Sequence, residues 1–366
     1  NMKYFKKTLT LFITLTASST SHAAPAFPCC PTDEHTVARP DAHAPISIMG
    51  DHTHGEGQWM ISYRHMSMEM EDLRKGDARV SFEELFLADG GYTVAPEWMY
   101  MNMHMLGIMY APTERLTLMA MGNYLETEMT HEIVSQMTAM MINGGDTKFT
   151  TYSRGIGDIK VSALYRFYLK ENRKAHFGIG LNLPTGSINK KDKLPSMGGA
   201  TNQQMPASMQ LGSGTFDLLP SLTFVEQFKD WSWGTQANGV LRLENKNSNN
   251  YRYGHKLELL GWVGCNLAQW LSLNGGLSYN YSDELKGVQK GVNRMGPNGR
   301  SVSTAFGENY GGHHLDLILG INLIKPTGYL ENHRLAFDLR LPIWRDTNGY
   351  QLETDSVLTF GWQKAF

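Results

Sequence analysis

The sequence has few cysteines, no long apolar run after its first residues and almost no net charge. Its 366 residues include three cysteines, too few for a scaffold held by disulfides. No stretch after residue 20 approaches the roughly 18 apolar residues of a membrane-spanning helix. Lys and Arg number 33 against 35 Asp and Glu, without a basic stripe. These absences exclude a helical membrane protein and argue against a nucleic-acid partner.

What the sequence does contain is typical of a folded chain with one unusual residue type. Charged residues make up 19%, aromatic residues 11%, and the mean hydropathy is −0.34. Such a chain is too apolar and too aromatic to be disordered. Methionine occurs 21 times, and 15 of these methionines fall between Met60 and Met141. This cluster is the feature that a functional interpretation must explain.

The first residues have the pattern of a secretory signal. Lys3, Lys6 and Lys7 precede the apolar run at 9–15, and small residues lead up to Ala23. We therefore expect residues 1–23 to be a cleaved signal peptide and the mature chain to work outside the cytoplasm. Residues 24–56 are then expected to form a periplasmic segment that contains Cys and His, and residues 57–366 a β-barrel.

The mature chain alternates apolar and polar residues in twelve long segments. The segments are approximately 58–70, 98–110, 115–129, 155–169, 174–184, 215–228, 231–245, 250–265, 270–282, 309–325, 332–345 and 352–366. In the tenth, Leu319 and Ile321 share one face while Gly320 and Asn322 share the other. This alternation predicts β-strands. At ten or more residues they are long for a soluble sheet and match a tilted transmembrane strand.

The connections between these segments differ in length in a regular way. The long connections, at 71–97, 130–154, 185–214 and 283–308, all occupy odd positions in the series. Outer-membrane barrels have this arrangement, with short periplasmic turns and longer external loops. We therefore predict an all-β antiparallel transmembrane β-barrel of about 12 strands in the bacterial outer membrane. A soluble β-sandwich is the alternative, and strand length and loop asymmetry both count against it.

The end of the sequence resembles the recognition signal of bacterial outer-membrane barrels. Phe366 is the last residue, and Leu358, Phe360 and Trp362 share one face of the last segment. Lys364 departs from the pattern, which usually has an aromatic residue at that position. The resemblance implies that the barrel-assembly machinery and outer-membrane lipid are partners of the chain.

Three short segments resemble one known family. Residues 178–187 (GIGLNLPTGS), 103–113 (MHMLGIMYAPT) and 210–215 (QLGSGT) look like a Met-rich branch of the outer-membrane family labelled "putative meta-pathway of phenol degradation". The resemblance spans roughly residues 48–366. It implies an outer-membrane barrel with a transport or channel role and brings no catalytic residues.

The methionines form rows on single strand faces. The rows comprise Met66, Met68 and Met70 in the first segment, Met99, Met101, Met103, Met105 and Met109 in the second, and Met119 and Met121 in the third. We predict that the rows face the lumen, because Leu106 and Ile108 on the opposite face suit lipid. If Ala111 pairs with Arg115 across the turn, Met105 lies opposite Met121.

A lumen lined by thioethers has three interpretations. Thioethers are soft ligands that suit Cu(I) or Ag(I), so the rows are candidate metal sites. Methionine also fills irregular interiors because its side chain is flexible. The third interpretation is an apolar path for hydrophobic or aromatic solutes. All three remain open from the sequence.

The segment before the first strand adds a second candidate metal site. His52 and His54 lie at i and i+2 and would point the same way in an extended chain. Cys29, Cys30, His35 and His43 precede them, and Cys and His together suit Cu(I) or Zn²⁺. The alternative is a periplasmic lead-in whose cysteines oxidise.

Charged residues also fall on faces predicted to be inward. They are Lys256, Glu258, Asp316, Arg334, Asp338 and Arg340, which could form a lumenal charge network or simply a solvated interior. Enzyme motifs are missing, so we expect no catalytic site. The sequence favours an outer-membrane channel for a small solute, with soft metal ions (copper or silver) as the leading candidate substrate. The alternatives are passage of hydrophobic or aromatic compounds and a non-transporting binding or structural barrel.

Overall fold

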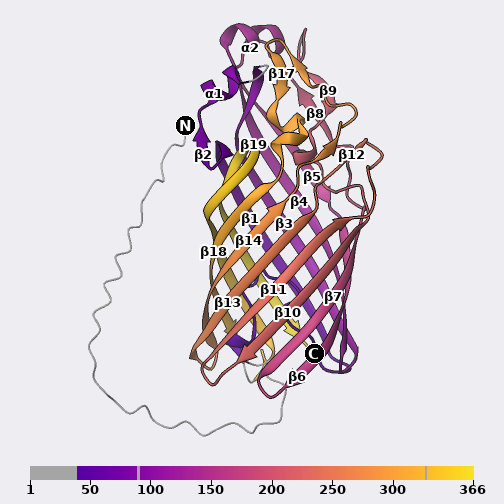
Figure 1. Ribbon diagram of the computed structural model, residues 1–366, viewed down its shortest axis with the longest axis vertical. Coiled ribbons are helices and arrows are strands. Elements are labelled where there is room, and N and C mark those ends of the chain that lie inside the picture. The colour runs from indigo at the N-terminus through magenta and orange to yellow at the C-terminus, as the bar shows by residue number, and fades with distance from the viewer. Residues whose placement is uncertain (1–38, 89–90, 326–327) are drawn as a thin grey trace, which may run out of the picture. The chain divides into compact units, whose positions relative to one another are not determined.

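Antiparallel strands that close on themselves form the body of the protein in this computed structural model (Figure 1). The structure describes residues 39–88, 91–325 and 328–366, so the predicted signal peptide and Cys29, Cys30 and His35 lie outside the described residues. The path of paired strands runs β3–β1–β19–β18–β14–β13–β11–β10–β7–β6–β4 and returns to β3. No helix in the described ranges is long and apolar enough to cross a membrane.

Eleven strand elements make up this closed path. They are β1 (Trp59–Gly76), β3 (Tyr92–Thr113), β4 (Leu116–Ile133), β6 (Ile159–Lys170), β7 (Arg173–Leu183), β10 (Asp217–Gln227), β11 (Trp231–Arg242), β13 (Lys256–Ala268), β14 (Leu271–Ser282), β18 (Gly312–Ile324) and β19 (His333–Ala365). The predicted β-barrel is therefore confirmed, although its strands are grouped differently from the twelve segments expected.

The difference arises at β19, which is 33 residues long. Its first part pairs with β18 as far as Thr347, and its second part pairs with β1 from Thr347 onward. The two parts contact each other, since the Trp362 indole nitrogen lies 3.1 Å from His333 Nδ1 and the Phe337 and Phe360 ring centroids are 4.9 Å apart. The predicted turn at 346–351 stays within the strand, so β19 folds back on itself without a break.

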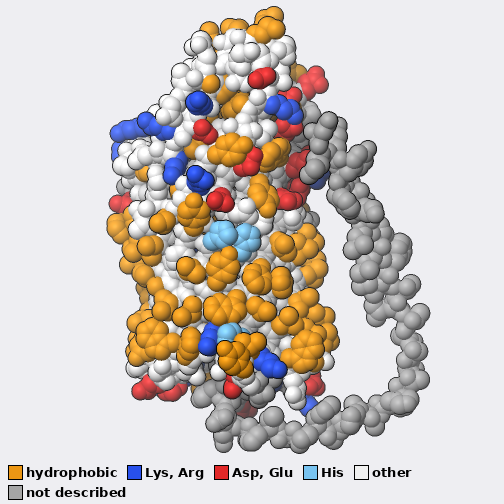
Figure 2. All heavy atoms as spheres, turned by 180° about the vertical axis from the view of Figure 1, so that it is seen from behind, with side chains coloured by type: hydrophobic (Ala, Val, Ile, Leu, Met, Phe, Trp, Pro, Cys, Tyr) orange, Lys and Arg blue, Asp and Glu red, His pale blue; other side chains and the backbone are white. Residues whose placement is uncertain are grey.

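The two faces of the strands differ as the alternation predicts. On β18, Leu319 and Ile321 are 47% and 42% exposed, whereas Asn322 is fully buried. On β19, Leu335 and Phe337 are exposed while Arg334 and Asp338 are buried. Figure 2 shows hydrophobic side chains gathered around the body of the barrel, with charged side chains towards its ends. The outer face of these strands is therefore apolar, whereas buried polar residues occupy inward positions, as in membrane barrels.

The connections are long at one end and short at the other (Figure 1). The long connections contain β2 (Ala78–Val80), α1 (Phe82–Leu87), α2 (Gln136–Ile142), β5 (Lys148–Ile156), β8 (Lys191–Leu194), β9 (Thr201–Gln204), η2 (Ala207–Met209), β12 (Tyr251–Arg252), β15 (Lys286–Gly287), β16 (Met295–Gly296), β17 (Gly299–Val302), η3 (Ser303–Ala305) and η4 (Gly307–Asn309). The remaining helix, η1 (Pro40–Ala42), precedes β1. The predicted asymmetry of the connections is thus present.

Several predicted boundaries are wrong. Strand β1 continues to Gly76 and β3 starts at Tyr92, both within the connection predicted at 71–97. The segment predicted to start at 250 forms barrel strand only from Lys256, because Tyr251 is fully buried and packs against Ala207 and Leu285 beneath the long connections. The connection predicted at 130–154 contains strand at both ends, since β5 pairs with the upper part of β4 and lengthens that hairpin beyond the barrel. Alternation in the sequence reports strand but not whether that strand belongs to the barrel wall.

Residues 39–58, which we name the plug segment, lie inside the short-turn end of the barrel. Ala44 and Ile48 pack against inward side chains of the wall, including Trp262 and Ile318. The wall also supplies partners for the backbone of the segment, a requirement for any buried irregular chain. The contacts are Asn322 Nδ2 to Pro40 O and His43 O, Arg334 to Ala44 O, Arg64 to Ile46 O, Gln236 to Met49 O, His176 to Gly50 O, Ser47 N to Asp338 and His54 N to Thr117.

Candidate functional site

Strand β3 carries five of the predicted metal-binding methionines and extends along the barrel wall. Met99, Met105 and Met109 are buried, whereas Leu106 and Ile108 on the opposite face are exposed. Because side chains alternate along a strand, Met101 and Met103 share the buried face. The methionines of β3 therefore face the lumen, as predicted.

The methionine row of β1 runs beside that of β3. In the antiparallel register Met70 lies opposite Met99, Met68 opposite Met101 and Met66 opposite Met103. Directly opposed residues on neighbouring strands lie about 4.5–5.5 Å apart, which brings side chains on one face into contact range. The two rows thus form a continuous methionine surface on one side of the lumen.

The predicted register between β3 and β4 is wrong by two residues. Met105 lies opposite Asn123, and Met121 lies opposite Gly107. The reason is that β3 continues to Thr113, so the turn closes later than expected. A shift of two keeps each side chain on its face, and Met121 is accordingly buried. Only its partner was misassigned.

The upper part of the methionine surface includes three residues that the sequence analysis missed, Met129, Met205 and Met209. Met205 and Met209 are fully or almost fully buried and pack with Met99 and Met129. Met70 and Met101 pack against the same group. Met205 and Met209 belong to the long connection between β7 and β10, where no periodicity marks a side chain as buried. Met129 lies on β4, where alternation from Met121 could have found it. We name Met70, Met99, Met101, Met129, Met205 and Met209 the methionine cluster.

A second methionine group lies lower in the barrel. Met60 and Met109 are buried together with Leu164, and Met119 packs against them. Met109 lies opposite both Met60 and Met119 in the registers of β3 with its two neighbours. The predicted rows therefore contribute to an upper cluster and to this lower group, and the remaining methionines of the rows belong to neither. These are Met66, Met68, Met103, Met105 and Met121.

An apolar cavity of about 420 Å³ opens above the methionine cluster, at the end with the long connections. Val94, Ile142 and Phe149 line it, together with Met205 and Met209 from the cluster. Small-molecule pockets are typically about 300–1,000 Å³ and mostly apolar. The cavity therefore has the size and lining to hold a small apolar molecule, with the methionine cluster beneath it.

A polar cavity of about 270 Å³ lies beside Met103. Lys160, Arg242 and the predicted network residue Lys256 line it, as do the carboxylates of Asp158 and Asp217. Along β3, Val94 thus marks the apolar cavity, Met99 and Met101 the cluster, and Met103 the polar cavity. A solute that moves down the barrel would meet these regions in that order.

The predicted charge network divides into two groups. An Arg340 guanidinium nitrogen lies 3.4 Å from Glu258 Oε1 and 3.8 Å from Asp316 Oδ2, and all three side chains are partly exposed. Arg334 and Asp338 instead bind the plug segment and are buried. The first group can meet a solute, whereas the second holds the plug segment in place.

Asp158 fixes the long connection that carries Met205 and Met209. Its Oδ1 accepts a hydrogen bond from Gly186 N, and its Oδ2 accepts from the Asn182 amide and from both the backbone N–H and hydroxyl of Ser213. Gly186 and Gly212 approach so closely that a Cβ on either would meet backbone atoms within 3 Å. Two of the segments that carry the family resemblance therefore meet at one buried carboxylate and have a structural role.

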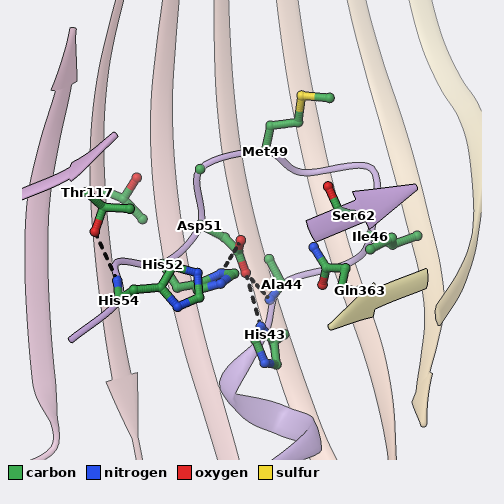
Figure 3. Close-up of polar contacts among 12 residues, drawn as sticks. His43, Ala44, Ile46, Met49, Asp51, His52, His54, Ser62, Thr117 and Gln363 are labelled. Carbon is green, nitrogen blue, oxygen red and sulfur yellow. Dashed lines mark hydrogen bonds and ion pairs between the residues drawn. The ribbon is translucent and has the colours of Figure 1, made fainter. Parts of the chain in front are cut away.

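The predicted metal residues His52 and His54 lie in the plug segment, beside His43 and Asp51 (Figure 3). His52 Nδ1 lies 2.7 Å from Asp51 Oδ1, and His43 Nδ1 lies 3.9 Å from Asp51 Oδ2. The His52 ring centroid is 4.8 Å from that of His43 and 4.9 Å from that of His54. Three imidazoles and a carboxylate thus form one buried group, of which the sequence identified only the histidines.

Burial and neighbouring side chains together set the charge of this group. Burial raises the pKa of the Asp51 carboxyl, but the adjacent His52, together with His43, lowers it by more, so the pKa falls well below its ordinary value. Burial and the neighbouring His52 lower the pKa of His54 to about 3. At neutral pH the group therefore holds a carboxylate and a neutral His54.

No protein family matches the chain in sequence, and no curated protein matches it either. Among solved structures, an outer membrane channel from Pseudomonas putida F1 is similar, with a TM-score of 0.55, 13% identity, and coverage of 87% of this chain and 99% of that one. The Ralstonia pickettii toluene transporter TbuX is similar with a TM-score of 0.43 and 10% identity, over 86% of this chain and 90% of that one. The first likeness supports the barrel fold of outer-membrane channels. The expected family itself remains a prediction.

Proposed function

We propose that the protein is an outer-membrane channel that admits small apolar solutes. The exposed apolar side chains around the barrel suit lipid, and the polar interior suits a lumen. When the two arms of β19 are counted separately, the barrel has twelve membrane-spanning strands, an even number as in bacterial outer-membrane barrels. Phe366 is exposed at the short-turn end, where the barrel-assembly machinery would read it.

The observation that carries the substrate class is the apolar cavity at the end with the long connections. Its lining is mostly apolar, and the methionine cluster continues the apolar surface below it. Thioether side chains are flexible enough to move around a passing molecule. A small hydrophobic or aromatic compound is therefore favoured over a sugar or an ion at the entrance.

The short-turn end sets a second requirement. The plug segment contacts the wall from β1, β4, β7, β11, β18 and β19, so it occupies the lumen there. A solute that reaches the polar cavity can leave through this end only when the segment moves. We therefore propose a gated channel with an apolar entrance.

Binding of an environment-sensitive apolar dye, 1-N-phenylnaphthylamine, to the detergent-purified protein tests the entrance. Ile142, which is 4% exposed, lines the cavity, whereas Met140 on the same helix is 66% exposed and does not. Ile142→Asn should weaken dye binding about tenfold, because the dye loses an apolar contact worth roughly 1.5 kcal/mol. Met140→Asn is the matched control and should bind like the wild type.

Both variants must first show the heat-modifiable migration of a folded barrel. Toluene should then displace the dye from the wild type, and glucose should not. Equal dye affinity in the folded Ile142→Asn variant and the wild type would show that the dye binds elsewhere. It would contradict the proposal that the apolar cavity is the entrance.

A second candidate substrate is a soft metal ion, favoured by the packing of six methionines around one point of the lumen. Thioethers coordinate Cu(I) and Ag(I), whereas an isosteric carbon side chain cannot. Met99, Met129, Met205 and Met209 can all be replaced by Leu, since Leu–Met exchanges usually cost less than about 1.5 kcal/mol each.

The fourfold Leu variant separates the two substrates. An apolar path predicts unchanged dye binding and no Ag(I) uptake in either protein. A soft-metal path predicts that the wild type retains Ag(I) after gel filtration and that the Leu variant does not. Equal Ag(I) retention by both folded proteins would exclude the methionine cluster as a metal site.

A further inference from the structure

The plug segment brings three histidines and one aspartate together, although they come from two separate parts of it. His43 follows the short helix η1, and Asp51, His52 and His54 lie near the start of β1. The potential ligand atoms of His43, Asp51 and His52 all lie within 4.8 Å of one another. The His54 ring stands nearly perpendicular to that of His52 at 4.9 Å. Such spacing suits side chains that share one ion.

The hydrogen bond between His52 and Asp51 determines which nitrogen is available. The carboxylate accepts, so His52 Nδ1 is the donor of this hydrogen bond and Nε2 is the nitrogen that faces a possible ion. Carboxylates orient metal-binding histidines in this way. Among the described residues, His52 Nε2 and both ring nitrogens of His54 are buried and have no hydrogen-bond partner. Buried nitrogen atoms without partners are uncommon and call for an explanation.

There is also space beside His43, Asp51 and His52. A cavity of about 40 Å³ is lined by His43, Asp51, His52 and Thr53, with Lys174 and His176 on the wall side. His176 is already engaged, because its Nε2 lies 2.8 Å from Gly50 O. The space is small enough for one ion and too small for an organic solute.

We propose that His43, His52 and His54, with Asp51 as ligand or orienting carboxylate, bind one divalent transition-metal ion of the Zn²⁺ class. Imidazole and carboxylate ligands suit Zn²⁺, whereas Cu(I) favours sulfur, which none of these four residues supplies. The ion would join residue 43 to residues 51–54 and so lock the loop of the plug segment between them. The site is distinct from the methionine cluster and does not depend on the solute that the channel admits.

Zinc retention by the full-length protein in detergent tests the site. The protein is stripped with a chelator, incubated with ZnCl₂, gel-filtered and analysed for zinc. The wild type should retain about one Zn²⁺ per chain, because the proposed ligands form a single site. The double variant His52→Ala/His54→Ala should retain none. Asp51→Asn should bind Zn²⁺ roughly 10–100-fold more weakly, as expected for an orienting carboxylate.

A matched control removes two other neighbouring histidines. The His65 and His104 rings are 4.7 Å apart on β1 and β3, away from the plug segment. His65→Ala/His104→Ala should retain zinc like the wild type. Heat-modifiable migration verifies that each variant is a folded barrel.

Two results would overturn the proposal. The first is a wild-type protein that retains no Zn²⁺ after it has been stripped and reloaded. This result needs no variant, so it does not depend on whether a variant folds. Zinc retention that survives in the folded His52→Ala/His54→Ala protein, or that is lost in the control, would assign the ion to other residues.

Discussion

Arg334 shows how one wall residue can hold a buried chain. Its guanidinium donates to Ala44 O of the plug segment, to Asn322 Oδ1 and to Gln363 Oε1, and the residue is only 4% exposed. Alternation in the sequence placed it on the inward face, but its partner Ala44 lies 290 positions earlier. The face on which a residue lies could thus be predicted from the sequence, whereas the residues that it contacts across the lumen could not.

Arg334→Met is expected to destabilise the barrel by roughly 2–5 kcal/mol. The long apolar side chain keeps much of the volume but leaves two or more buried acceptors without a donor, each costing about 1–3 kcal/mol. The measurement is the temperature at which the band of the folded barrel disappears in heat-modifiability gels. Arg79→Met, at a side chain that is 62% exposed, is the control and should change stability by less than about 1 kcal/mol. Equal effects of both changes would show that Arg334 does not anchor the plug segment.

At the scale of the elements, strands were predictable and connections were not. Period-two alternation identified the wall strands and the direction of their faces, because lipid and lumen impose opposite polarity on alternate residues. The register between two strands depends on where their turn closes. Because β3 continues to Thr113, two residues further than predicted, its register with β4 was predicted wrongly. The connection that carries Met205 and Met209 depends on contacts with Asp158 and Gln289, which no local pattern reports.

Asp158→Asn should loosen that connection while the wall remains folded. The amide would turn a donor towards Gly186 N or towards Ser213, so at least one buried N–H loses its acceptor at a cost of about 1–3 kcal/mol. Limited proteolysis should then cut within residues 184–216 faster than in the wild type. Asp146→Asn, at an exposed residue of another long connection, should not change the cleavage rate. An unchanged rate in the Asp158 variant would assign the rigidity of the connection to other contacts.

At the scale of the whole molecule, irregular chain packs against inward residues of the wall at both ends. The long connection between β7 and β10 adds Met205 and Met209 to the methionine cluster, and the plug segment fills the short-turn end. The sequence placed His52 and His54 before the first strand but left open whether any segment enters the lumen. Whether a segment enters the lumen depends on the space inside the assembled barrel, and an alternation pattern along the chain does not report that space.

Charges placed in the plug segment should open the short-turn end. Ile46 and Ile48 are 1% and 3% exposed, and aspartates at these positions could not stay buried without partners. The barrel wall is unchanged, so Ile46→Asp/Ile48→Asp should fold and conduct small ions in planar bilayers far more often than the wild type. Leu87→Asp, at a residue 79% exposed on the long-connection side, should conduct like the wild type. Matching conductance in all three proteins would show that the plug segment does not control passage.

The hairpin of β19 has a consequence for the order in which the molecule assembles. The plug segment precedes β1, yet two of its anchors, Arg334 and Asp338, lie about 290 positions later, in the element that also pairs with β1 to close the wall. Its binding site is therefore incomplete until β19 has joined the sheet. Contacts so distant in sequence slow folding, because the chain must close a long loop before they form. The plug segment is therefore enclosed only when the β19 hairpin pairs with β1 and closes the barrel around it.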